Sequence, residues 1–218
     1  MRYKTVLFDF DGTIMDSGKG IIRCAVETAQ HFGLEPPGEA QLRKFVGPPI
    51  VLSFVDTFGV SREQAEKMVL HYREVHRSSN AKLEGSVYAG IEELLERLNE
   101  AGATCAVASV KNRVTVQETV EHFGLEKHFK AVCGGDGVTM PDKAVIVREC
   151  LQKLHVSDKS STILVGDSDY DAIGAGQVGI DFCAVLWGYG FSVEADVKKF
   201  DCKSIAHDVQ ELGRFLLG

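Results

Sequence analysis

The second half of the chain alternates short apolar runs with segments of helical periodicity, and this alternation is the strongest constraint on the fold. Strands alternating with helices are typical of a parallel sheet covered by helices. A separate apolar run from Val6 to Phe8 predicts a further buried strand. We therefore predict an α/β fold with a Rossmann-like parallel sheet core. Its later strands are expected at 103–109, 130–133, 162–166 and 181–186, and its helices at 112–123, 142–154 and 169–177.

A purely helical stretch separates the first strand from this alternating region. Apolar residues recur there with helical period, and Ser61 is the expected cap of the longest helix. We predict a discontinuous core domain of residues 1–15 and 82–218, with residues 16–81 inserted as a helical domain over the strand ends. The inserted helices are expected at about 17–32, 39–46, 50–58 and 61–78.

Two aspartates directly follow the first strand. Asp9 and Asp11 are two residues apart, which matches the period of a strand, so both can project from one face at its carboxyl end. Gly12 then allows a sharp turn. An Asp-Gly turn alone would explain this pattern, but two carboxylates this close repel unless a cation or a proton lies between them. The pair is therefore a candidate for a nucleophile and an acid/base.

Polar groups also follow two of the later elements. Ser109 ends the strand at 103–109, and the backbone N–H groups of 110–112 follow it, as a phosphate oxygen requires. Ser109 is equally explained as a helix cap. Lys143 stands at the first turn of a helix, where the dipole disfavours a cation, so an anion is expected beside it.

The run from Thr162 to Asp171 predicts a metal site. A buried strand delivers Asp167 to its carboxyl end, and Asp171 follows four residues later on the first helical turn. Hard oxygen ligands suit Mg²⁺. Acidic residues at a helix start are also explained by the helix dipole, a reading that fits Asp169 better than its two neighbours.

The four motifs together resemble those of the haloacid dehalogenase superfamily, and the resemblance spans the whole chain. It implies that Asp9 is the nucleophile, Asp11 the acid/base, and Lys143 the cation beside them; the usual Lys-Pro of the family is absent here. The helical insertion resembles the C1 cap of subfamily I, and the segments at 45–50 and 87–91 look like those of phosphoglycolate phosphatase and nucleotidase-like relatives. The implied Mg²⁺ ligands are Asp9, Asp11, Asp167 and Asp171, and the implied substrate-binding residues are Gly12, Thr13, Ser109, Val110, Lys111, Asn112, Lys143, Gly47 and Arg43.

The resemblance implies a Mg²⁺-dependent phosphatase acting on a small phosphate monoester such as phosphoglycolate, through an aspartyl-phosphate. A 5'-nucleotidase, a pyrophosphatase or a phosphoglucomutase-like phosphotransferase of the same family would keep every motif. A non-catalytic binding module is disfavoured because every catalytic position is filled. A haloalkanoate dehalogenase would leave Asp11, Asp167 and Asp171 without a role.

Composition narrows the choice of partner. A formal charge of −7 over 218 residues argues against binding to nucleic acid or to an anionic membrane. The six cysteines form no CxxC pair and several lie in apolar runs, which is typical of reduced core residues. We expect a cytoplasmic monomer or homodimer whose partner is a small phosphorylated metabolite.

Overall fold

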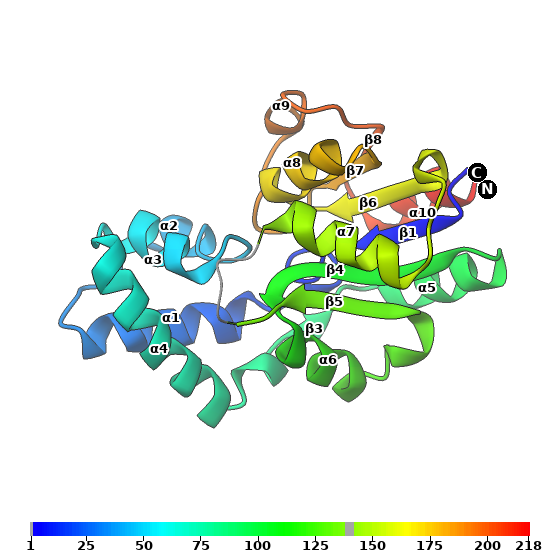
Figure 1. Cartoon of the computed structure of the whole chain (residues 1–218). Coiled ribbons are helices and arrows are strands. Elements are labelled where there is room, and N and C mark those ends of the chain that lie inside the picture. Colours follow the sequence, from blue (N-terminus) through cyan, green and yellow to red (C-terminus); the bar gives the residue numbers. More distant parts are fainter. Residues whose placement is uncertain (1, 138–141) are drawn as a thin grey trace.

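The computed structural model describes residues 2–137 and 142–218. Within these residues six parallel strands form one sheet with helices on both faces, which confirms the predicted α/β class (Figure 1). The strand order across the sheet is β5-β4-β1-β6-β7-β8. The strands are β1 (Thr5–Phe8), β4 (Thr104–Asn112), β5 (Ala131–Gly135), β6 (Thr162–Gly166), β7 (Asp181–Val185) and β8 (Ser204–Ala206).

Alternating side chains of the strands feed two separate hydrophobic clusters. Val6 and Phe8 pack on one face with α5 (Ile91–Glu100), α6 (Arg113–His122) and α10 (Val209–Leu217). Leu7 packs on the other face with α7 (Lys143–Lys153), α8 (Asp169–Val178) and α9 (Glu194–Val197). Because both faces are covered, the middle residues of β1, β6 and β7 are apolar on both sides of the sheet.

β1 lies at the centre of the sheet and pairs with β4 on one side and β6 on the other. The chain passes from β1 to β4 and β5 first, and only later crosses to β6. The strand order therefore reverses at β1. Ligands of open α/β sheets bind at the carboxyl ends of strands beside such a reversal.

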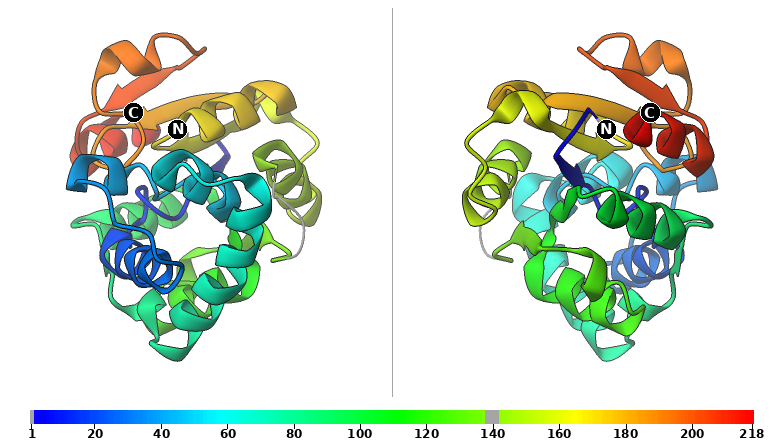
Figure 2. Two further views of the ribbon diagram at one scale, coloured as in Figure 1. Left: turned by 90° about the vertical axis from the view of Figure 1, so that its left-hand side faces the viewer. Right: turned by 90° about the vertical axis from the view of Figure 1, so that its right-hand side faces the viewer.

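The four inserted helices lie beyond these carboxyl ends (Figure 2). They are α1 (Gly18–His31), α2 (Glu39–Arg43), α3 (Ile50–Phe58) and α4 (Arg62–Ser78), close to the predicted bounds. The Ser61 hydroxyl accepts a hydrogen bond from Gln64 N and caps α4 as expected. The helices have a hydrophobic cluster of their own, in which Phe45 and Phe54 meet edge to face with ring centroids 4.9 Å apart.

Two features of the fold were not predicted. A two-stranded antiparallel ribbon joins β2 (Met15–Asp16) to β3 (Ser86–Val87), where the chain enters and leaves the inserted helices. After residue 186, strand β8 completes the sheet, and helices α9 and α10 are added to the fold. Each of these strands has two or three residues, too few for a visible period. No helix among the described residues is both long and apolar enough to cross a membrane.

Candidate active site

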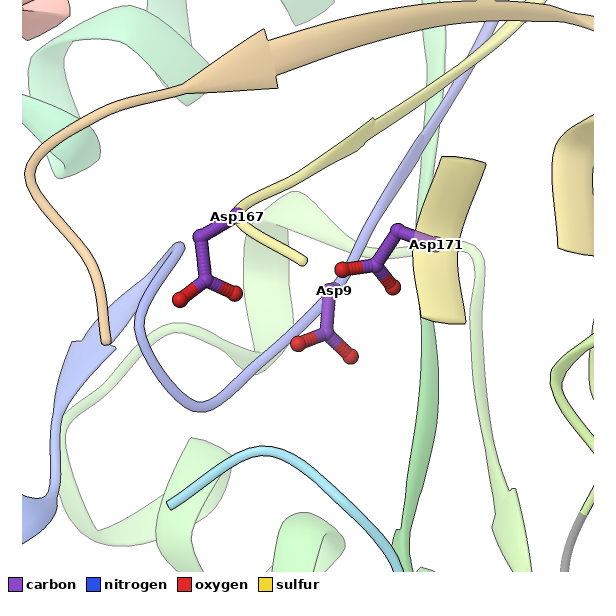
Figure 3. Close-up of side chains that lie close together, drawn as sticks. All are labelled: Asp9, Asp167 and Asp171. Carbon is purple, nitrogen blue, oxygen red and sulfur yellow. The ribbon is translucent and has the colours of Figure 1, made fainter. Parts of the chain in front are cut away.

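Three carboxylates converge at the carboxyl edge of the sheet centre. Asp9 directly follows β1, Asp167 directly follows β6, and Asp171 lies on the first turn of α8. Carboxylate oxygens of the three residues lie within 4.8 Å of one another, and all three residues are buried (Figure 3). Asp9 N donates to Val165 O at 2.8 Å, which holds the first carboxylate in line with the strand pair β1–β6.

Asp167 is fixed by backbone groups on one side and leaves one oxygen without a partner. Its Oδ2 accepts hydrogen bonds from the N–H groups of Tyr189 at 2.7 Å and Gly190 at 3.1 Å. Its Oδ1 is buried and has no hydrogen-bond partner among the described residues. A Cβ at Gly12 would lie 2.3 Å from Asp167 Oδ2, so the turn that follows Asp11 approaches this carboxylate too closely for any side chain. Buried polar atoms are nearly always partnered, so the orphaned Oδ1 points to a missing ligand.

Lys143 joins two of the carboxylates from the first turn of α7. Its Nζ lies 2.5 Å from Asp9 Oδ1 and 2.6 Å from Asp171 Oδ1, and the side chain is almost fully buried. The other oxygen of Asp171, Oδ2, accepts hydrogen bonds from Ser168 N and Ser168 Oγ. Lys143 thus has the anionic neighbour expected from its place at a helix start. Asp171, with both oxygens occupied, is placed to orient Lys143 and the α8 turn.

Burial has the largest effect on the pKa values of Asp9 and Asp167. It raises the pKa of Asp9 to about 7, although the Lys143 charge opposes the rise. It raises the pKa of Asp167 to about 8, helped by the charges of Asp171 and Asp9 and opposed by the Tyr189 and Gly190 amides. Burial alone would lower the pKa of Lys143, but Asp171 and Asp9 raise it, so the ammonium stays charged. A cation beside Asp167 would reverse the effect of burial on both acids.

The Asp11 carboxylate is held by a different cation from that of Asp9. Its Oδ1 accepts hydrogen bonds from Ser17 Oγ at 2.5 Å and Lys111 Nζ at 2.8 Å. Ser17 stands at the N-cap position of α1, but its hydroxyl bonds to Asp11 and makes no side-chain cap bond. Lys111, which the family resemblance implied as a substrate-binding residue, pairs here with Asp11.

The segment after Ser109 continues as a strand instead of starting a helix. β4 extends to Asn112, with an irregularity in its pairing to β5 between Ser109 and Asn112. Ser109 is buried and its hydroxyl accepts a hydrogen bond from Lys111 N at 3.3 Å. Val110 lies within this strand, and the Asn112 side chain accepts from Thr115 N and caps α6. The predicted helix start at 112 is therefore one residue early, and Asn112 has a capping role.

The inserted helices meet the core over a cleft of about 370 Å³ beside the carboxylates. Val46 and Pro48, on either side of Gly47, line it from the inserted helices, and Tyr170 and Tyr189 line it from the core. Arg43, predicted to bind substrate, lies with its guanidinium 5.3 Å from the centre of the ring of Tyr189, a residue that lines the cleft. Thr13, also predicted there, is fully buried; its carbonyl accepts from Trp187 Nε1 at 3.2 Å, and its hydroxyl has no partner among the described residues.

Sequence reasoning missed the residues that support these side chains. Ser168, Tyr189 and Gly190 hold Asp171 and Asp167, and Ser17 holds Asp11. A signal was present for two of them: Trp187-Gly188-Tyr189-Gly190-Phe191 follows the last predicted strand, at the sheet edge where ligands bind.

A divalent cation fits the residues present. Three buried carboxylates converge, and Asp167 has an oxygen without a partner among the described residues. The raised pKa values of Asp9 and Asp167 would be lowered by a cation. Carboxylate and carbonyl oxygens are the ligands that Mg²⁺ prefers. Asp9 and Asp167 are the side chains best placed to hold it, and Asp11, which the family resemblance also implies as a ligand, would contribute its backbone carbonyl.

The comparisons with known proteins agree with this geometry. A family model described as haloacid dehalogenase-like hydrolase matches residues 6–185. A 5'-nucleotidase of Pseudomonas aeruginosa is 34% identical over 218 residues, covering 99% of this chain and 96% of that protein. The tyrosine-protein kinase PtkA of Mycobacterium tuberculosis is 34% identical over 187 residues, covering 85% of this chain but 62% of the kinase.

The fold recurs in solved structures. The crystal structure of a predicted phosphatase from Clostridium acetobutylicum superposes with a TM-score of 0.91 at 32% identity, covering 100% of this chain and 99% of that one. The family match spans most of the chain, and the carboxylates and Lys143 occupy the strand ends and helix start where the motifs place them. The chain therefore belongs to the haloacid dehalogenase-like hydrolase family, as a phosphatase.

Proposed function

We propose that this protein hydrolyses a small phosphate monoester in a Mg²⁺-dependent reaction that passes through an aspartyl-phosphate. The observation that carries the proposal is the buried Asp9 carboxylate, flanked by Lys143 at 2.5 Å and by an Asp167 oxygen that lacks a partner. A nucleophile and a phosphate are both anionic, so a site for this reaction must gather positive charge. Lys143 supplies one such charge, and Mg²⁺ would supply the other by stabilising negative charge on the phosphate oxygens.

Asp9 and Asp11 divide the chemistry between them. An Asp9 carboxylate oxygen attacks phosphorus, and the bond from phosphorus to the leaving-group oxygen breaks. Asp11 gives its proton to that oxygen, and then takes a proton from the water that attacks the phosphorus of the aspartyl-phosphate. Lys111 and Ser17 both bond to Asp11 Oδ1 and so fix the carboxyl group in orientation. Phosphate and free Asp9 are the products of the second step.

The remaining groups of the site bind and enclose the substrate. Ser109 lies on β4, two residues beyond the residue paired with Phe8 of β1, and we assign its hydroxyl to the phosphate. Residues 16–81 act as a cap that excludes bulk water, and the leaving group occupies the cleft between cap and core. This cleft contains Lys44 but also Asp56 and Asp169, so it favours no single sign of charge.

The proposed substrate is a small phosphorylated metabolite, and the proposed location is the cytoplasm. The six cysteines are free within the described chain, and five of them are buried, which supports a reducing compartment. The 5'-nucleotidase relative makes a nucleoside monophosphate the first alternative to a phosphoglycolate-like substrate.

Phosphate release from a substrate panel tests the proposal. The panel contains phosphoglycolate, nucleoside monophosphates, pyrophosphate, sugar phosphates and p-nitrophenyl phosphate, each with Mg²⁺ and with EDTA. We expect release that requires Mg²⁺, with the highest kcat/KM identifying the substrate. Mutase or kinase activity would appear as transfer of labelled phosphate to a sugar or protein acceptor without release to water. A folded protein that releases no phosphate from any compound would contradict the proposal.

A further inference from the structure

The segment from Trp187 to Gly190 is the part of the core that touches the most functional groups at once. It follows β7 and runs past the ends of β1 and β6. Its Trp187 ring nitrogen donates to Thr13 O at 3.2 Å, and its Tyr189 and Gly190 amides donate to Asp167 Oδ2. A Cβ at Gly188 would lie 2.2 Å from that oxygen. The segment therefore has little freedom to shift without moving Asp167.

The Tyr189 side chain runs from this segment to the place where the chain leaves the core. Its hydroxyl donates a hydrogen bond to the Asp16 carboxylate and accepts one from Gly18 N at 2.9 Å. Asp16 ends β2 and Gly18 begins α1, so both belong to the outgoing crossing between core and cap. Burial and the Asp16 bond raise the pKa of Tyr189 to about 12, so the hydroxyl remains a donor at neutral pH.

The same segment also contacts the returning crossing. The Trp187 ring packs edge to face against the ring of Tyr88, which directly follows β3, with ring centroids 6.4 Å apart. β3 pairs with β2, with Asp16 opposite Ser86. The 187–190 segment thus contacts both crossings through which any movement of the cap must pass, through Tyr189 on the outgoing side and Trp187 on the returning side.

A third contact reaches the body of the cap. Arg43, the last residue of α2, lies over the Tyr189 ring at 5.3 Å and donates from Nη2 to Gly188 O at 3.4 Å. Arg43 is exposed, and it is the cap side chain that the sequence suggested as a substrate ligand. Its contacts make it instead a link between the cap and the 187–190 segment, since both of its partners belong to that segment.

We propose that Tyr189 is a positioning residue that couples the place of the cap to the geometry of Asp167. Its backbone N–H holds the carboxylate, its hydroxyl holds the outgoing crossing at Asp16 and Gly18, and its ring contacts Arg43. Movement of the cap would displace the Tyr189 side chain, and the backbone N–H of the same residue orients Asp167. The inference rests on the proposed function, because it assigns Asp167 to the metal. Coupling between two sites is reciprocal, so loss of the link weakens both cap placement and metal binding.

Tyr189→Phe separates this role from simple packing, because it keeps the ring for Arg43 and removes only the hydroxyl. We expect the Mg²⁺ dissociation constant, measured by calorimetry without substrate, to rise about fivefold, at the lower end of typical coupling between sites. We expect kcat/KM to fall about tenfold, because a misplaced Asp167 also weakens phosphate stabilisation. Asp16→Asn, which keeps an acceptor but removes its charge, should shift both values in the same direction and by less.

Two matched controls isolate the link. Tyr3→Phe also removes a phenol bond to an aspartate, Asp181 at 2.8 Å, but Tyr3 precedes β1 and lies at the opposite end of that strand from the site. Arg73→Met removes an exposed arginine of α4, against which Arg43→Met is compared. Both controls should change Mg²⁺ affinity by less than about twofold, the usual scatter of independent substitutions.

The double variant of Arg43→Met with Tyr189→Phe gives a second readout. Both changes act through one segment. The double variant should therefore raise the Mg²⁺ dissociation constant by less than the product of the two single fold-changes. A folded Tyr189→Phe protein with Mg²⁺ affinity within about twofold of the unaltered chain would overturn the inference. So would equal losses in Tyr3→Phe. Absence of phosphatase activity in the unaltered protein would instead contradict the proposed function, and the Mg²⁺ titrations would still measure the link; absence of Mg²⁺ binding there would overturn both.

Discussion

The floor of the site and the cap above it are built in different ways. The floor consists of buried charges at strand ends and helix starts: carboxylate oxygens of Asp9 and Asp167 lie within 4.8 Å of each other, and Lys143 pairs with Asp9. The cap has its own aromatic cluster around Phe45 and Phe54, and it meets the floor through a few polar contacts such as Arg43 with Gly188. Floor residues are therefore expected to control chemistry and stability, and cap residues to control access and placement.

Replacing the nucleophile should give the largest effect and should leave the cap untouched. We expect Asp9→Asn to lower kcat by about 10⁴-fold or more, as removal of a covalent nucleophile does in other enzymes. The measurement is phosphate release with saturating Mg²⁺, alongside circular dichroism to verify folding. Asp201→Asn is the control, because Asp201 is an exposed acid that lies outside both the carboxylate cluster and the cleft. Equal losses in both variants would place the chemistry elsewhere.

Removing the buried cation should affect stability as well as activity. Lys143→Met leaves Asp9 and Asp171 without their shared partner, and breaking a buried pair costs about 3–5 kcal/mol of unfolding free energy. Lys111→Met is the comparison, because Lys111 is less buried than Lys143 and Asp11 is its one ion-pair partner among the described residues, so we expect a smaller loss. Urea denaturation in the presence of Mg²⁺ measures both. Equal stability of the two variants would show that the contacts of Lys143 with Asp9 and Asp171 stabilise the fold no more than the contact of Lys111 with Asp11.

Metal removal should reveal the buried acids through the pH dependence of stability. Folding raises the pKa of Asp9 to about 7 and of Asp167 to about 8. A carboxyl raised in this way contributes stability below its unfolded pKa of about 4, and that contribution is lost as the pH rises through the folded value. In EDTA we therefore expect Tm to fall between about pH 5 and pH 8.5, and Mg²⁺ to restore about 5 °C or more at the higher pH.

The same scan has an internal control. Asp9→Asn removes one of the two titrating acids, so its Tm in EDTA should fall less steeply over the same range. A Mg²⁺ effect that is equal at both pH values, or larger at the lower one, would contradict the assignment of these acids as the metal site.

The cap should respond to pH in the opposite direction and more weakly. Burial, and then the Lys111 charge, lower the pKa of His76 on α4 to about 4, with smaller contributions of the same sign from Lys82 and Arg23, while the Asp11 charge opposes them. A histidine lowered in this way contributes stability above its unfolded pKa of about 6.5, which is lost as the pH falls toward the folded value. We expect the chain to lose about 1 kcal/mol between pH 7 and pH 5 for this reason.

His76→Gln should abolish that loss without affecting Mg²⁺ affinity. Urea denaturation at both pH values measures it, with His122→Gln as control because His122 is exposed at the end of α6. An unchanged pH dependence in His76→Gln would show that the cap has no titrating group of consequence at this position.

The floor could be predicted from sequence far better than the cap contacts. Asp9, Asp167 and Lys143 were predictable because a parallel sheet brings all carboxyl ends to one edge, so residues at strand ends and helix starts converge whatever lies between them. Arg43 and Tyr189 were not, because their contact depends on how the inserted helices dock, and helical periodicity carries no information about docking. Tyr189 lies 146 residues after Arg43, with no shared pattern to connect them.

The predicted boundary between β4 and α6 was wrong for a related reason. Asn112 caps α6 while β4 continues to that residue, so strand and helix propensity overlap over Ser109 to Asn112. The pairing irregularity opposite Gly134 and Gly135 decides where the strand ends, and strand pairing is invisible in a single chain segment.

The β2–β3 ribbon has a consequence for how such proteins change over time. Asp16 and Ser86 face each other as ladder partners, so the polypeptide departs from and re-enters the core at neighbouring points. A tight hairpin turn would join those two positions as well as the natural insertion does. Genetic deletion or exchange of everything between them therefore leaves β1 and β4 in register. This junction allows new specificities to be grafted onto an old reaction centre.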